Sequence, residues 1–190
     1  MSKLQKVYVA VMAVICAFGV IAVAFFNSKP YVYPSGSVID EEYVKALSWN
    51  YVKENGFKLG FYMAAIPVIL LIYTVIYRLK GIYMGKRAKL TYVLLPTVII
   101  LGLFAFLPGM IRVGLGKPGA AVEIVTGKKT GHDRKGGTSY YLAFDGGKVE
   151  VPDNWYDRYN IGDKLVVVRS GGVPLEVQQP EVFTISDDMS

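Results

Sequence analysis

Residues 78–89 of the chain read RLKGIYMGKRAK, a stretch with five basic side chains and no acidic one. Runs without any charged residue lie on both sides of it, at residues 59–77 and 90–111. Each run has about the 20 residues that a helix needs to cross a hydrocarbon core of ~30 Å. A short loop rich in Lys and Arg between two such runs is typical of the cytoplasmic side of a membrane. The side chains expected to set this orientation are Arg78, Lys80, Lys86, Arg87 and Lys89.

A third charge-free run covers residues 7–26, and Lys3 and Lys6 precede it. This order places the N-terminus in the cytoplasm and the C-terminal segment on the opposite side. A signal peptide cleaved after Ala24 would show the same order of features. The run continues into two phenylalanines, which favours an uncleaved helix, and both alternatives give the rest of the chain the same topology. The sequence thus predicts three spans, at about residues 7–26, 57–78 and 90–111.

The net charge of +6 is unevenly distributed along the chain. Residues 1–117 contain 13 Lys and Arg against 4 Asp and Glu, whereas residues 118–190 contain 8 against 11. The basic excess therefore flanks the predicted spans, and we expect its partner to be the lipid bilayer rather than nucleic acid. The three runs contain no ionisable Asp, Glu, Lys, Arg or His, which disfavours ion or proton transport.

Residues 38–55, between the first two spans, are predicted to form an amphipathic helix outside the membrane. Ser37 followed by Asp40 resembles a helix start, and the pair at residues 55–56, Asn-Gly, resembles a helix stop. Apolar side chains recur every four residues, at Ile39, Tyr43, Leu47 and Tyr51. This stripe can pack on the chain's own outer domain or on the lipid surface, or it can dock a separate protein, and the sequence leaves these uses open.

From residue 118 onward the pattern changes to short alternating segments with turn residues between them. We expect strands at residues 121–126, 139–144, 148–151, 164–169 and 182–185, and a sixth at 175–178. Asp145-Gly146-Gly147 favours a tight hairpin between the second and third strands. The predicted fold class is membrane α plus β, with three transmembrane helices followed by a small all-β extracytoplasmic domain, a barrel or sandwich of five or six strands. The predicted domains are a membrane domain (1–117), a β-domain (118–186) and a tail (187–190).

Within this domain, residues 140–144, 147–151 and 159–168 resemble a widespread bacterial family of membrane-tethered small β-domains of unknown function. In that family a strand and a hairpin lead to a tyrosine and then to a Gly-Asp turn before an apolar strand, here Tyr159, Gly162 and Asp163. The chain departs from the family at residues 169–174, where the family has an aromatic and an acidic residue before its proline. The resemblance implies a fold more than an activity, and it suggests the inner membrane of a bacterium as the location.

The polar residues of the outer segment form no recognisable catalytic or cofactor motif. Ser139, His132 and Asp163 would be the members of a Ser-His-Asp set, but no nucleophile elbow accompanies them. One histidine and the single Cys16, which lies within the first apolar run, provide neither a disulfide nor an ordinary zinc site. We therefore expect no catalytic residue, no cofactor and no metal.

Two groups of residues are candidates for contact with a partner. Lys128, Lys129, Arg134 and Lys135 can meet anionic lipid, an acidic polymer or an acidic protein, or can keep a hairpin tip soluble. Trp155 and Tyr156 lie among carboxylates, where the alternatives are acid–base chemistry, an aromatic anchor for a partner and rings that pack over the end of the β-domain.

The function expected from the sequence is that of a non-enzymatic membrane protein that presents its β-domain for protein–protein interaction or assembly, with a protein partner or a second copy of the chain. Two alternatives stay open. An immunity-type protein would protect the membrane from a toxin, and an envelope enzyme would use the polar residues between positions 128 and 163.

Overall fold

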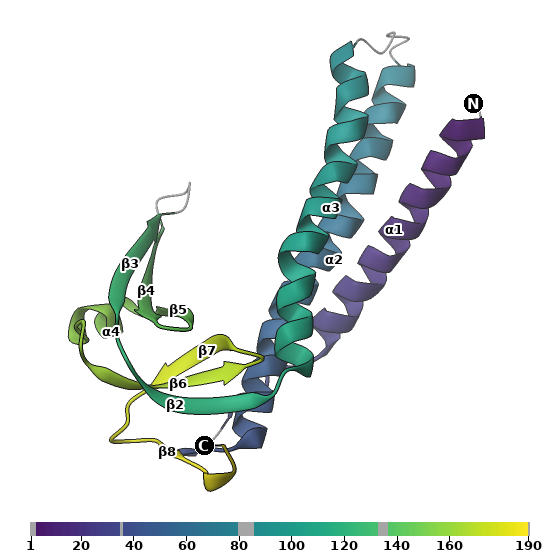
Figure 1. Cartoon of the computed structure of the whole chain (residues 1–190). Helices are drawn as coiled ribbons and strands as arrows, with labels where there is room; N and C mark the ends of the chain where they lie inside the picture. The colour runs from purple at the N-terminus through teal and green to yellow at the C-terminus, as the bar shows by residue number, and fades with distance from the viewer. Residues whose placement is uncertain (1–2, 35, 80–85, 133–136, 190) are drawn as a thin grey trace. The chain divides into compact units, whose positions relative to one another are not determined.

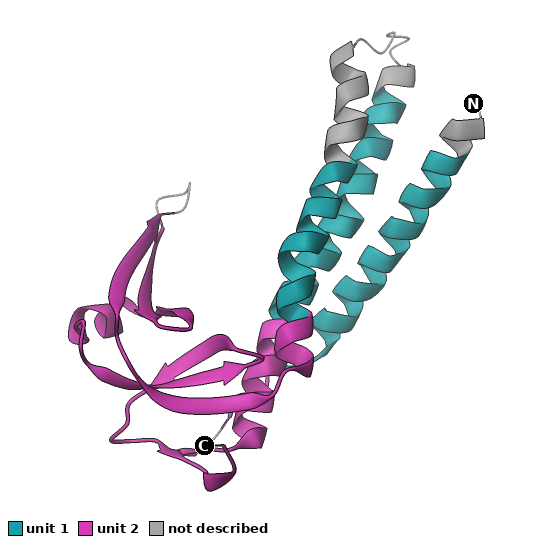
Figure 2. Cartoon of the chain, in the orientation of Figure 1, with its two compact units in different colours: residues 1–30, 53–110 teal, residues 31–52, 111–190 magenta. Residues whose placement is uncertain are grey.

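The structure, a computed structural model, describes residues 3–34, 36–79, 86–132 and 137–189, and within them the side chains of residues 7–34, 36–76, 96–132 and 137–189. The chain divides into two compact units (Figure 2). Unit 1 contains residues 1–30 and 53–110, and unit 2 contains residues 31–52 and 111–190. Lys80 lies outside the described residues, and so do the side chains of Arg78, Lys86, Arg87 and Lys89.

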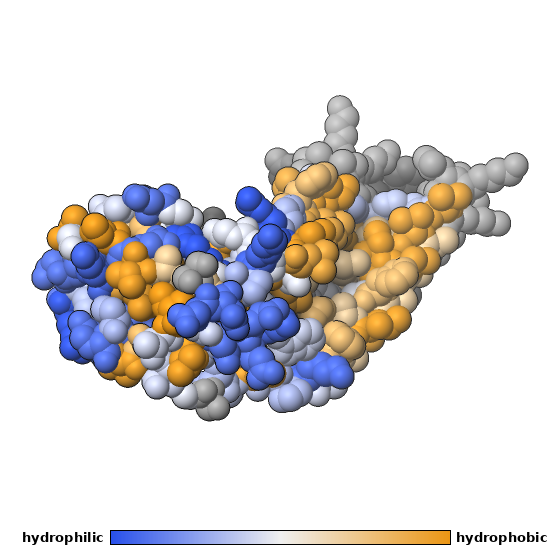
Figure 3. Space-filling view, turned by 60° about the horizontal axis from the view of Figure 1, so that its bottom comes forward, coloured by the Kyte–Doolittle hydropathy of each residue, from blue (hydrophilic) through white to orange (hydrophobic). Residues whose placement is uncertain are grey.

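Three long helices dominate the chain (Figure 1): α1 (Lys3–Ser28), α2 (Glu41–Leu79) and α3 (Lys86–Leu115). All three are long and apolar enough to cross a membrane, as the sequence predicted. Their outward side chains in unit 1 are largely apolar, among them Phe18, Leu71 and Phe104. In Figure 3 the helices show this apolar surface, and unit 2 shows a more polar one. Such an apolar exterior is suited to contact with lipid rather than water.

Helix α2 differs from the prediction because it is one continuous element rather than two helices separated at residues 55–56. Gly56 stays in the helix, and a Cβ atom at this position would collide with the ring of Phe26. The glycine therefore serves a close contact between helices, whereas an Asn-Gly pair more often ends a helix. The predicted start at Ser37 is also wrong. Asp40 caps the helix instead, because its Oδ1 accepts a hydrogen bond from the backbone N–H of Tyr43 at 2.8 Å.

The helices of unit 1 pack through a small apolar core and through glycines. Met12, Ile66, Leu70 and Ile99 form the buried cluster. On one side of this cluster α1 and α2 approach each other so closely that a Cβ at Gly19 or Gly60 would meet atoms of the opposite helix. Close approach of this kind is a common device of helix pairs in membranes, where dispersion contacts replace the hydrophobic effect.

Unit 2 contains three sheets and two short helical segments. The strands are β1 (Val38–Ile39), β2 (Pro118–Ile124), β3 (Gly127–His132), β4 (Thr138–Phe144), β5 (Gly147–Val151), β6 (Lys164–Ser170), β7 (Val173–Gln178) and β8 (Thr184–Ile185). The helical segments are α4 (Asp153–Arg158) and the 3-10 turn η1 (Asp187–Met189). Strands β2-β6-β7 form one antiparallel sheet and β3-β4-β5 another, whereas β1 and β8 pair in parallel.

The β-rich segment after residue 118 is confirmed, but none of its sheets closes into a barrel within the described residues. The predicted hairpin is present, with Phe144 opposite Gly147. The described residues of the segment form seven strands instead of five or six, and the prediction missed β3, which it assigned to a loop. The sequence of β3 is mainly lysine and glycine, which lack the apolar alternation typical of a strand. Gly131 nevertheless has a role in the sheet. A Cβ there would lie 3.3 Å from the ring of Tyr141 on the neighbouring strand.

Two apolar clusters stabilise unit 2. The first lies between the two antiparallel sheets, which both contribute to it, and consists of Val125, Leu142, Phe144, Val149, Val151, Leu165, Val167 and Val177. The second lies on the other face of the β2-β6-β7 sheet and consists of Ile39, Tyr43, Val44, Ala120, Val166 and Val168. Residues 31–52, which the sequence placed with the membrane domain, thus share a core with the β-strands. The predicted tail also belongs to unit 2, because Met189 packs against the second cluster.

The turn between β6 and β7 caps the last turn of α3 inside unit 2. The hydroxyl of Ser170 donates a hydrogen bond to the carbonyl of Val113 at 2.7 Å, and the N–H of Gly171 donates to the carbonyl of Lys117 at 3.1 Å. Gly171 has φ +55°, and a Cβ there would meet the carbonyl oxygen of Arg112. These contacts satisfy carbonyls at the helix end that would otherwise lack partners.

Candidate functional site

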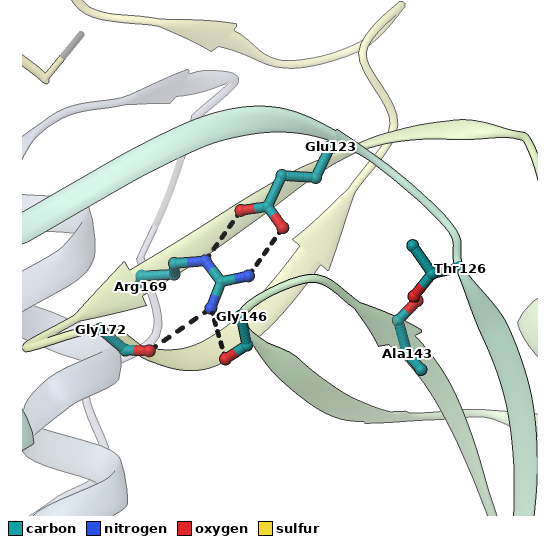
Figure 4. A network of polar contacts seen from close by, with 6 residues as sticks. All are labelled: Glu123, Thr126, Ala143, Gly146, Arg169 and Gly172. Atoms are coloured by element: carbon teal, nitrogen blue, oxygen red, sulfur yellow. Dashed lines mark hydrogen bonds and ion pairs between the residues drawn. The ribbon is translucent and has the colours of Figure 1, made fainter.

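Arg169 of β6 is the centre of the most extensive polar network in the described part of unit 2 (Figure 4). Its Nε and Nη2 donate to the two carboxylate oxygens of Glu123 at 2.8 and 2.7 Å. Its Nη1 donates to the carbonyls of Gly146 at 3.1 Å and Gly172 at 3.4 Å. One guanidinium group thereby joins β2, β6 and the turns of two hairpins. All four acceptors belong to the fold itself, so this arrangement stabilises unit 2 and leaves no free group for chemistry.

A second network anchors the start of α2 on the sheet. The hydroxyl of Tyr43 donates to Glu176 Oε2 and accepts from Gln178 Nε2, both at 2.9 Å. The predicted apolar stripe of Ile39, Tyr43 and Leu47 packs into the second cluster. Of the uses that the sequence left open, packing on the chain's own outer domain is therefore the observed one. Ile39 and Tyr43 are buried there, and Leu47 is half-buried against the same cluster.

The aromatic residues of α4 also pack against the protein's own core. Trp155, Tyr156 and Tyr159 are half-buried against the first cluster, and the Tyr156 ring lies 5.0 Å from the ring of Tyr140. The Nζ of Lys128 lies 4.3 Å from the centroid of the Tyr156 ring. Of the alternatives for Trp155 and Tyr156, the structure shows rings that cover the core.

Two of the polar residues considered for catalysis, His132 and Asp163, have local hydrogen-bond partners. His132 Nδ1 contacts Thr138 Oγ1 at 3.3 Å, across the β3–β4 pair. Asp163 Oδ2 accepts from the backbone N–H of Asn160 at 2.8 Å, within the turn before β6. Among the described residues no hydrogen bond joins Ser139, His132 and Asp163 to one another. Nor do these residues contain a group of three His, Cys, Asp or Glu side chains placed to hold a metal ion.

The described residues of unit 2 line at least two open hollows. The first, of about 320 Å³, has an acidic lining of Asp40, Glu41, Glu42 and Asp188. Three of these carboxylates lie at the start of α2, where the helix dipole favours negative charge. The second, of about 430 Å³, is lined mainly by Trp49, Val52, Leu115 and other residues of α2 and of the end of α3. Every buried polar side-chain atom that the structure describes has a hydrogen-bond partner, so neither hollow contains a buried group left for a ligand.

The outward face of the β3-β4-β5 sheet carries a group that the sequence missed, which we call the basic–aromatic face: Lys129, Tyr141 and Lys148, with the exposed Glu150 directly opposite Tyr141 on β5. Lys129 is directly opposite Tyr141 in the strand register. Lys148 lies diagonally across, with its Nζ 4.0 Å from the centroid of the Tyr141 ring. Of the four basic candidates, Lys129 belongs to this face, Lys128 contacts Tyr156, and Arg134 and Lys135 lie outside the described residues. The pairing of β4 with β5 brings Lys148 close to Tyr141. The only sign of this contact in the sequence was the alternation of side chains along these two strands.

Comparison with known protein families, with curated proteins and with solved structures gives no match to this chain. A function for the protein must therefore be argued from its own residues and geometry.

Proposed function

We propose that the protein is a three-span protein of the bacterial inner membrane that presents unit 2 outside the cytoplasm for protein–protein interaction or assembly, and catalyses no reaction itself. This proposal rests on which segments of the chain make up unit 2. Val38 pairs with Thr184 and Ile39 with Ile185, so the loop after α1 and the C-terminal segment fold together. The two segments are separated along the chain by α2 and α3. They can share one side of a membrane only if both of these helices cross it or neither does.

Length and apolar composition favour the first alternative, since α2 and α3 both contain enough apolar residues to span. With α1 also spanning, the N-terminus and residues 78–89 lie on one side and unit 2 lies on the other. The five basic residues of that loop favour the cytoplasm for the first side. Unit 2 is then extracytoplasmic, and we class it as a two-sheet β-sandwich because both antiparallel sheets contribute to one core.

The kind of activity follows from how unit 2 uses its polar side chains. Arg169, Tyr43 and Ser170 all bind groups of the same unit, which supports a structural module rather than a reactive site. The basic–aromatic face is solvent-accessible and combines two ammonium groups and one carboxylate, that of Glu150, with one aromatic ring, so its net charge is positive. A face of this composition suits a partner with carboxylates at its contact surface.

The location is tested by two fusions of a reporter enzyme, one after Lys86 and one after Asp188. Alkaline phosphatase, which is active only outside the cytoplasm, is expected to work at the second position and not at the first. A cytoplasmic reporter should give the reverse pattern. Phosphatase activity at residue 86 without activity at residue 188 would contradict the proposed topology.

The interaction is tested by reversing the charge of the basic–aromatic face with Lys129→Glu and Lys148→Glu in the full-length protein. Chemical crosslinking of intact cells is expected to capture a complex with the parent protein and to lose it with this double variant. Lys164→Glu, the same change at an exposed position at the start of β6, is the matched control and should keep the complex. Equal crosslinking of all three proteins would contradict the proposed role of this face.

A further inference from the structure

Residues 31–34, with the sequence Tyr-Val-Tyr-Pro, follow α1 and are bound to α2 by the side chain of Asn50. The amide of Asn50 makes two hydrogen bonds to the backbone of Val32. Asn50 Oδ1 accepts from the Val32 N–H at 2.9 Å, and Asn50 Nδ2 donates to the Val32 carbonyl at 2.6 Å. Both polar groups of this peptide position are thereby satisfied, as they would be beside a neighbouring strand. We call residues 31–34 the tyrosine strap.

The tyrosine strap presents two aromatic rings together. In an extended segment alternate side chains point to the same side. In agreement, the ring centroids of Tyr31 and Tyr33 are 6.4 Å apart. The two residues are 45% and 80% exposed, although a tyrosine ring is mainly apolar. Two exposed hydrogen bonds from Asn50 thus fix the backbone between two tyrosine rings that are accessible to solvent.

The chain connections of the strap bring it close to the membrane surface. The charge-free stretch of α1 ends at Ser28, and Tyr31 follows three residues later, which is at most about 10 Å of extended chain. The strap is also linked to α2 through Asn50. This residue precedes the charge-free part of α2 by nine residues, a rise of about 14 Å along the helix. The headgroup layer adds about 5–8 Å to each side of the hydrocarbon core. A tyrosine side chain that points toward the membrane can therefore reach this layer.

We propose that the tyrosine strap binds the phospholipid surface, with the rings of Tyr31 and Tyr33 in the headgroup layer and their hydroxyls donating to lipid phosphate or ester oxygens. Tyrosine suits this layer because its ring is apolar and its tip is a hydrogen-bond donor. The lipid contact requires that α1 and α2 span, but it is independent of any protein partner of unit 2.

The test uses the full-length protein in vesicles of phosphatidylethanolamine and phosphatidylglycerol. The photoreactive residue p-benzoylphenylalanine replaces Tyr33, and the intact mass is measured after irradiation. We expect a covalent adduct with the mass of one phospholipid. Ile161, at 66% exposure in the same unit, provides the matched control position, and its adduct yield should be severalfold lower.

Two changes at Asn50 then test whether the strap must be held. Asn50→Ala removes both hydrogen bonds, and Asn50→Asp keeps the acceptor for the Val32 N–H but loses the donor to its carbonyl. Each is expected to lower the lipid adduct at position 33 severalfold, and Asn50→Asp serves where Asn50→Ala fails to fold. An adduct to protein in place of lipid, no adduct, equal yields at positions 33 and 161, or no change on substitution of Asn50 would each overturn the proposal.

Discussion

At the scale of single residues, Arg169 is the side chain on which unit 2 depends most. The side chains of Arg169 and Glu123 are only 16% and 21% exposed, so their pair is mostly shielded from water. Arg169→Ala would leave the carboxylate of Glu123 and the carbonyls of Gly146 and Gly172 without this donor. We expect the free energy of unfolding of unit 2 to fall by about 2–3 kcal/mol. Urea unfolding of the full-length protein in detergent measures this, followed by the tryptophan emission of Trp49 and Trp155, which both belong to unit 2.

A double variant separates the loss of the pair from the burial of an unpaired charge. Arg169→Met together with Glu123→Leu replaces both partners by apolar side chains of similar size. Such replacements of shielded ion pairs are often close to neutral. The double variant should therefore be more stable than Arg169→Ala alone. If the double variant were the less stable of the two, an unpaired Glu123 could not be the cause of the loss.

The same residues show what sequence could not predict. In the sequence, Arg169 differed only in departing from a family pattern, and no pattern indicated a role for Glu123. The two are 46 positions apart, and only the antiparallel pairing of β2 with β6 brings them together. Local patterns, by contrast, act within a few residues. The hairpin at Asp145-Gly146-Gly147 was predictable because its cause lies in the turn residues themselves.

At the scale of elements, the three helices and most strands were predictable, whereas the course of α2 was not. Hydropathy and strand alternation are strong signals because they repeat over a whole element. The interruption expected at Asn55-Gly56 depended on one residue pair, and a contact with Phe26 of another helix decides the conformation there. Strand β1 has only two residues and is defined by its pairing with β8, so no local sequence pattern predicts it.

The packing of α1 on α2 gives a prediction at this scale, through Gly19→Ala. The added methyl would meet backbone atoms of Met63 and Ala64, which cannot move aside as a side chain can. Overpacking of this kind typically costs about 1–3 kcal/mol, which exceeds the ~1 kcal/mol that alanine contributes to a helix interior. We expect unit 1 to unfold at a lower mole fraction of dodecyl sulfate, as measured by circular dichroism.

Gly102→Ala provides a matched control on α3. A Cβ at Gly102 would have its nearest neighbour, Leu59 Cδ1, at 3.9 Å, an ordinary contact. Helix propensity then dominates, and this variant should be as stable as the parent protein or more stable. Equal destabilisation by the two substitutions would show that space between α1 and α2 is not what requires glycine at position 19.

At the scale of the whole molecule, the organisation of the chain follows from contacts between segments far apart in the sequence. Sequence patterns divided the chain at residue 117, where hydropathy changes to strand alternation. The structure instead assigns residues 31–52 to the same unit as residues 111–190, because the start of α2 and strand β1 complete a core with β6 and β8. Composition marks the type of each segment, but the assignment of segments to a common unit requires their three-dimensional pairing.

This organisation predicts a disulfide that reports both the pairing and the compartment. Val38 and Thr184 are direct neighbours in the parallel β1–β8 pair, and Cα atoms of adjacent strands lie about 5 Å apart, within the range that a disulfide spans. In a Cys16→Ser background, Val38→Cys with Thr184→Cys should therefore form a disulfide. If unit 2 is extracytoplasmic, the bond should form in growing cells without added oxidant, because that compartment is oxidising.

Alkylation of free thiols before gel electrophoresis measures the bonded fraction. A bond that forms only after oxidant is added to lysed cells would support the pairing and place unit 2 in the cytoplasm. Its absence under both conditions would contradict the pairing on which the proposed three-span topology depends.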